Sequence, residues 1–171
     1  MQFKYIYNFL LLLFISYYSY GQVNKIDLTW ESGGEFQKTK ITITLKKNET
    51  EKYTLNFIEE KICDLCKDFN NKIIKERNIF IAKNDFDRLL NAIKLLDITE
   101  LNNNNNFDFF IWFPPTMKLV LYENDIDIFS IKYVSPQQIN DFPIPLYPLN
   151  KIVQDIFKLA GIKSKKYCPK M

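Results

Sequence analysis

Histidine is absent from this sequence of 171 residues. That residue is the usual general base of serine and cysteine hydrolases, the commonest zinc ligand and the usual switch near neutral pH. The sequence therefore excludes the common forms of these mechanisms and leaves carboxylates, lysines, tyrosines and cysteines for any chemistry. Because these residues form no recognisable motif, we predict no catalytic, cofactor-binding or metal-binding residue.

A strong excess of charge of one sign is also absent, since 23 Lys and Arg residues stand against 20 Asp and Glu residues, a formal net charge of +3. Nucleic-acid-binding domains usually concentrate a basic excess on one face. Here the two signs are interspersed, except in the basic tail at 163–166. We expect no nucleic acid among the partners of this chain.

Uncharged apolar runs are short, and the longest occupies residues 9–15, behind Lys4 and ahead of the small residues Ser19 and Gly21. This order is that of a cleavable export signal. The run is also shorter than the ~20 residues that a membrane-spanning helix requires. We therefore predict that residues 1–21 are a cleaved signal peptide. The mature chain, 22–171, is expected to be secreted or periplasmic and to have no membrane span.

Cysteine is scarce, with Cys63, Cys66 and Cys168 in the whole chain. An oxidising compartment favours a disulfide. A bridge from Cys168 to Cys63 or Cys66 would close a loop of about 100 residues, which the chain-entropy model values at ~4 to 5 kcal/mol. The sequence favours this bridge and leaves the choice of partner open. Cys63 and Cys66 also form a C-x-x-C, but the residues around it differ from those of a thioredoxin-like redox site.

Strands are indicated where apolar and polar residues alternate with a period of two. Three such segments follow the leader, and their apolar positions are Ile26, Leu28 and Trp30; Ile41, Ile43 and Leu45; and Tyr53, Leu55 and Phe57. Residues 59–83 are predicted to be a loop and one irregular strand. A second group of strands is predicted at 107–113, 117–123 and 126–134. In the last of these, Asp127 is expected on the same side as Phe129 and Ile131.

Two amphipathic helices are predicted from apolar residues at helical spacing. The first covers 85–96 behind Asn84 as its N-cap, and the second starts near Pro148 and ends at Gly161 in the left-handed conformation. Their apolar stripes are Phe86, Leu89, Leu90, Ile93 and Leu96, and then Leu149, Ile152, Val153, Ile156, Phe157 and Ala160.

The fold predicted for residues 22–171 is a single α+β domain with a basic, cysteine-containing C-terminal tail. About six or seven strands form a twisted antiparallel sheet, and two helices pack on one face of it. The order of strands and helices also suggests a duplicated βββα unit.

The first functional hypothesis is a non-catalytic binding protein whose partner is another extracytoplasmic protein or an envelope component. Its anchors would be exposed aromatic residues, since such residues dominate many interfaces. The candidates are Phe110, Trp112, Phe142 and Tyr147. The alternatives are a carboxylate-dependent hydrolase of envelope or extracellular glycans, using acids among Asp108, Glu123, Asp125 and Asp127, and a redox protein using the C-x-x-C.

Overall fold

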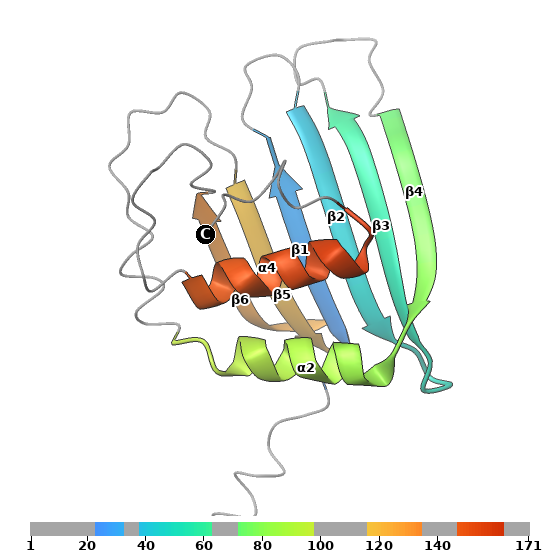
Figure 1. Cartoon of the computed structure of the whole chain (residues 1–171), viewed down its shortest axis with the longest axis vertical. Coiled ribbons are helices and arrows are strands. Elements are labelled where there is room, and N and C mark those ends of the chain that lie inside the picture. The colour runs from blue at the N-terminus through green and yellow to red at the C-terminus, as the bar shows by residue number, and fades with distance from the viewer. Residues whose placement is uncertain (1–22, 33–37, 63–71, 98–115, 135–146, 163–171) are drawn as a thin grey trace, which may run out of the picture.

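The computed structural model describes residues 23–32, 38–62, 72–97, 116–134 and 147–162. These residues form one six-stranded antiparallel sheet with the strand order β4-β3-β2-β1-β5-β6, and two helices, α2 and α4 (Figure 1). The elements are β1 Lys25–Glu31, β2 Lys38–Lys47, β3 Tyr53–Ile62, β4 Lys72–Ile81, α2 Lys83–Lys94, β5 Thr116–Glu123, β6 Ile126–Val134 and α4 Tyr147–Leu159. The predicted α+β class, the antiparallel sheet and the two helices are confirmed.

The central strand, β1, pairs with β2 on one side and with β5 on the other. From β1 to β4 the chain forms a meander, and α2 then leads it from the β4 edge back to β5. Figure 1 shows both helices on the same face of the sheet. One sheet face is therefore covered, and the other face and the two edge strands, β4 and β6, lie away from the helices.

The core lies between the sheet and the helices, and the alternating residues predicted for the first three strands all point into it. Ile26, Leu28, Ile43, Leu45 and Leu55 are fully buried. Alternation therefore encodes one buried face in each strand. Truncating such a side chain to alanine costs about 2 to 5 kcal/mol, because the transfer free energy is lost and a cavity remains.

The helices close this core with the stripes that the sequence predicts. In α2, Phe86, Leu89 and Ile93 are buried, and Phe86 packs against Tyr53 of β3 with ring centroids 5.1 Å apart. In α4 the predicted stripe from Leu149 to Ala160 is buried throughout. An ion pair between Arg88 and Asp155, 3.3 Å long, joins the exposed sides of the two helices.

Three local predictions are wrong in detail. The first helix has Ala82, not Asn84, as its N-cap, without a side-chain cap hydrogen bond. Residues 59–62 continue β3 and are not part of a loop, whereas residues 72–81 form the predicted strand, whose pairing with β3 is irregular because the register shifts between Glu59 and Glu60. Asp127 lies opposite Tyr122, whereas Phe129 lies opposite Leu121, because the pairing shifts at a bulge between Leu121 and Tyr122. The bulge therefore moves Asp127 to the uncovered face.

The predicted duplication stays a prediction. Four strands precede α2, and two described strands lie between α2 and α4. The strand predicted at 107–113 falls outside the described residues.

Candidate functional site

The uncovered face of the sheet is mostly polar near its centre, and its residues form cross-strand rows set by the register. One row joins Tyr122, Lys25, Lys46 and Thr54, and the next joins Val120, Asp27, Thr44 and Asn56. Both rows include charged or amide side chains close to the centre of the sheet. Because neighbouring side chains on one face of a sheet lie within contact distance, these rows are the first place to look for a site.

A half-buried cluster joins Lys25 and Asp27 of β1 to Tyr122 of β5. Lys25 Nζ lies 3.0 Å from Asp27 Oδ2 and 4.2 Å from the centroid of the Tyr122 ring. Asp27 Oδ1 is buried and has no hydrogen-bond partner. These contacts fix the three side chains side by side, so the cluster is held in one arrangement.

Both titratable partners of Asp27 hold their protons more tightly than usual. Burial raises the pKa of Tyr122 first, and the negative charge of Asp27 raises it further. Burial alone would lower the pKa of Lys25, but the hydrogen bond to Asp27 and the charge of that carboxylate raise it above 10.5. A lysine and a tyrosine with raised pKa values are poor nucleophiles and poor bases near neutral pH. The cluster therefore has the properties of a structural ion pair.

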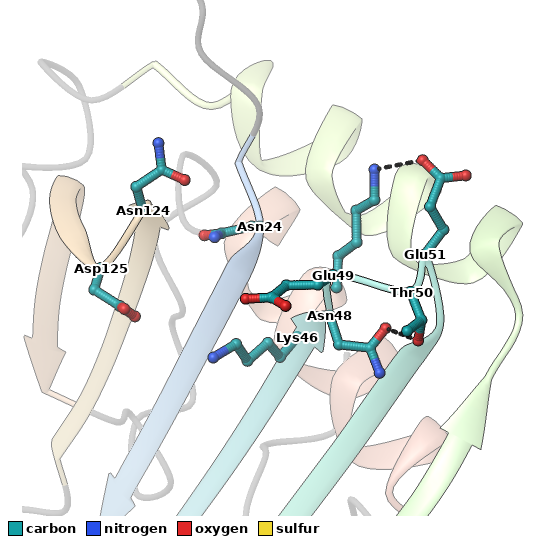
Figure 2. A pocket seen from close by; sticks show the side chains of 9 residues that line it. Asn24, Lys46, Asn48, Glu49, Thr50, Glu51, Asn124 and Asp125 are labelled. Carbon is teal, nitrogen blue, oxygen red and sulfur yellow. Dashed lines mark hydrogen bonds and ion pairs between the residues drawn. The ribbon is translucent and has the colours of Figure 1, made fainter.

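An open hollow of about 730 Å³ lies at one end of the sheet, between the β2–β3 loop and the β5–β6 turn (Figure 2). Its lining is entirely polar and consists of Asn24, Lys46, Lys47, Asn48, Glu49, Thr50, Glu51, Asn124 and Asp125. In Figure 2 the Glu49 side chain lies near those of Asn24 and Lys46, and Asp125 lies on the opposite side. Charges of both signs are therefore mixed around an open space.

Two tight turns shape this hollow. In the β2–β3 loop, Asn48 Oδ1 accepts hydrogen bonds from the Lys52 N–H at 2.8 Å and from Thr50 Oγ1 at 3.0 Å. In the β5–β6 turn, Asn124 and Asp125 have φ values of 49° and 65°. Two successive positive φ values are those of a type I′ turn, for which Asn and Asp are suited. The turn residues are thus explained by backbone geometry alone.

The acidic residues of the hydrolase hypothesis lie in different parts of the structure. Asp125 is exposed in the β5–β6 turn beside the hollow, and Asp127 lies opposite Tyr122 on β6. Glu123 is the last residue of β5, and Asp108 lies outside the described residues. Within the described ranges, no group of three or more acids or cysteines is placed to hold a metal ion.

A smaller hollow of about 240 Å³ lies on the uncovered face, where Lys118 of β5 lies directly opposite Lys132 of β6. Thr29, Glu31, Lys40 and Thr116 complete its lining. Its charge is therefore mixed, with an excess of lysine.

Among the described elements, the edge strand β4 has the most exposed large hydrophobic residues. Its sequence, KIIKERNIFI, is exposed at every position except the last, which is half-buried. Ile73, Ile74, Ile79 and Phe80 are 52%, 47%, 38% and 77% exposed. The opposite edge, β6, exposes Ile126 and Ile128. Long strands with exposed apolar side chains at a sheet edge invite pairing with another chain.

The candidate residues from the sequence have the following positions. Tyr147 begins α4 and is 40% exposed. Phe110, Trp112 and Phe142 lie outside the described residues, as do Cys63, Cys66, Cys168 and the leader. Sequence reasoning missed the β4 edge, although the adjacent apolar pairs in KIIKERNIFI departed visibly from strict alternation.

Among the described residues, no helix is both long and apolar enough to cross a membrane. Comparison with known proteins found no family model that matches this chain and no match among curated proteins.

Proposed function

We propose that this chain is a non-catalytic binding protein of the secreted or periplasmic space, and that β4 is the strand to which a partner protein binds. The observation that carries the proposal is the exposure of Phe80, Ile73 and Ile74 along a ten-residue strand at the edge of the sheet. Within the described sheet β4 pairs with β3 on one side only, so an incoming extended segment on the other side would gain both main-chain hydrogen bonds and apolar contacts.

An apolar edge strand without a partner is costly to the free protein. Fully burying a large apolar side chain contributes roughly 1.5 to 3 kcal/mol, and Phe80 is still 77% exposed. Apolar edge strands also promote aggregation, which natural proteins resist with charges and bulges. The β4 strand has both, since Lys75, Glu76 and Arg77 lie at its centre and the pairing with β3 shifts near Glu59. An edge strand that is protected in this way but is still apolar at both ends is suited to reversible binding of a partner.

The secreted or periplasmic location of the chain is part of the same proposal. Its support is the leader at 1–21, which has the order of an export signal. In that compartment we expect Cys168 to be bridged to Cys63 or Cys66. Intact mass and peptide mapping without reduction test both points: a start at Gln22 and a single bridged peptide are expected, and an intact Met1 or three free thiols would contradict them.

The binding function is tested by capture of a partner followed by hydrogen exchange on the complex. The exported chain is used as bait in the native secreted fraction, and amide exchange is then compared between the free and the bound chain. We expect exchange in Lys72–Ile81 to slow and exchange in β6 to stay unchanged. Phe80→Asp should abolish capture, because it places a charge in the apolar contact.

The matched control is Ile126→Lys, which adds a charge at an exposed position, 68% accessible, on the opposite edge. It should leave capture intact. If Phe80→Asp captures the partner as well as the original chain does, or if the protected amides lie elsewhere, the proposal is wrong.

A further inference from the structure

We infer that the segment bound by β4 belongs to a different protein and alternates acidic with large apolar residues. This inference rests on the proposed function and specifies the partner of the same strand. It follows from the register between β3 and β4, which fixes the face on which each exposed side chain of β4 lies.

The helix side of β4 is basic from Lys72 to Arg77, and it is apolar beyond them at Ile79 and Ile81, which lie opposite Leu55 and Tyr53. Arg77 lies opposite Phe57 and Lys75 lies opposite Glu59 on β3. Because Phe57 is buried in the core under the helices, paired residues in this row belong to the helix side. Lys72, beyond the bulge, lies opposite Lys61. In the part of the chain that the structure describes, none of Lys72, Lys75 and Arg77 forms an ion pair.

Arg77 has a second neighbour on this side, the C-terminal end of α4. A Cβ atom added to Gly161 would lie 3.2 Å from Arg77 Nη1. The guanidinium group is therefore close to the negative end of the helix dipole, which favours a cation there. Lys75 Nζ lies 6.0 Å from the centroid of the Phe57 ring. Lys72 and Lys75 are both exposed and are therefore accessible to a partner.

The uncovered side of β4 is apolar at its ends. Phe80 lies opposite Thr54, and Ile73 lies opposite Glu60. Between them lie Glu76 and Asn78. A strand added beside β4 turns its side chains alternately to the two faces. On the helix side its residues would meet the cations from Lys72 to Arg77, and on the uncovered side its terminal residues would meet Phe80 and Ile73. Acidic residues on the first side and apolar residues on the second therefore complement β4.

A second copy of this chain does not fit. Two identical antiparallel strands related by a two-fold axis keep matching faces together, so residues of equal parity lie opposite each other. Two registers would let the two β4 strands overlap over nearly their whole length. In the first register, Glu76 would lie opposite Glu76 of the second copy and Lys75 opposite its Arg77. In the second register, Arg77 would lie opposite Arg77 of the second copy. Like charges directly opposite each other are destabilising, so the charges that admit an acidic strand also oppose self-pairing.

The experiment uses the full exported chain and three capped decapeptides of alternating residues as probes: valine with glutamate, valine with serine, and valine with lysine. Binding is measured by titration calorimetry, and the site is located by hydrogen exchange. We expect the glutamate peptide to protect Lys72–Ile81 and to bind about tenfold more tightly than the serine peptide, and the lysine peptide to bind more weakly still. The difference should shrink as salt is raised, because exposed charges are screened.

Charge reversal on β4 supplies the matched variant. Lys72→Glu with Lys75→Glu should reverse the order of the glutamate and lysine peptides, whereas Lys118→Glu, on a different strand, should leave the order unchanged. Circular dichroism and the unfolding midpoint confirm that each variant is folded, and the single variant Lys75→Gln replaces the double variant if that one is not.

Three results would overturn the inference. Equal binding of the serine and glutamate peptides at β4 would remove the acidic requirement and leave the edge as a docking strand. Sedimentation of the chain as a dimer with protected β4 amides would identify the second copy as the partner. Absence of binding by every peptide would also overturn it, and the capture experiment above then decides the proposed function independently.

Discussion

Replacing Gly161 by alanine should destabilise the protein by about 1 kcal/mol, because the backbone at this position is in the left-handed region. Gly161 has a φ of +69° and follows the last turn of α4. Its N–H donates to the Lys158 carbonyl at 3.0 Å, and the Ile162 N–H donates to the Phe157 carbonyl at 2.9 Å. These two bonds are those of a Schellman motif, which requires a left-handed residue at this position.

The magnitude has three parts. A non-glycine residue in the left-handed region costs roughly 1 to 2 kcal/mol. Alanine also reduces the freedom of the unfolded chain, which offsets ~0.4 to 1 kcal/mol. The new Cβ would lie 3.2 Å from Arg77 Nη1, and since that atom ends a flexible, exposed side chain, the contact is relieved at small cost. The net loss of about 1 kcal/mol lowers Tm by about 2 to 4 °C for a domain of this size.

Urea unfolding followed by tryptophan fluorescence measures this loss as a lower midpoint at an unchanged m-value. Gly161→Asn is the control for backbone conformation, because asparagine tolerates the left-handed region better than alanine does. Arg77→Ala combined with Gly161→Ala is the control for the contact, and Gly161→Ala should cost the same in that background. If Gly161→Ala leaves the midpoint unchanged, or if Arg77→Ala restores the loss, the reasoning from φ is wrong.

Two further predictions follow from the same structure. Glu51 has a φ of 56° in the β2–β3 loop, and it forms an ion pair with Lys47 in which the glutamate side chain is 80% exposed. Because an exposed ion pair adds little stability, Glu51→Gly should stabilise the protein by about 0.5 to 1 kcal/mol, whereas Glu51→Ala should give no gain in the same urea assay. The pKa values of Tyr122 and Lys25 are raised, so the folded state holds these two protons more tightly than the unfolded state does. Their contribution to stability is therefore complete below about pH 9. It is lost as the pH rises through the pKa values of the folded state. Urea midpoints measured from pH 8 to pH 11 should fall at the alkaline end, and Tyr122→Phe should make that fall shallower; an equally steep fall in the variant would contradict the assignment.

Much of the fold was predictable because one buried face leaves a periodic signal in the sequence. The alternation in β1, β2 and β3 and the helical spacing in α2 and α4 identified the residues that fill the core. Gly161 was predictable for a related reason, since the end of an apolar stripe followed by glycine indicates a left-handed cap.

The β4 edge and the position of Asp127 were not predictable in this way. Strict alternation is lost in KIIKERNIFI because this strand is exposed on both faces at every position except the last, so burial does not impose a period of two. Asp127 changes face because one bulge shifts the register of β6 against β5. A local pattern contains no information about such a shift.

The sequence by itself determined which residues turn inward, because burial against water acts on each residue separately and repeats with the period of its strand or helix. Only the tertiary structure decided which strands lie at the edges and which charges become neighbours. Lys25, Asp27 and Tyr122 meet because β5 pairs with β1 although the two strands are far apart in the sequence. Lys72, Lys75 and Arg77 share a side because of the register and the bulge between β3 and β4, and they are accessible because β4 has no strand beyond it in the described sheet. Pairing between segments distant in sequence sets these neighbours, and the proposed binding strand exists only as a result of it.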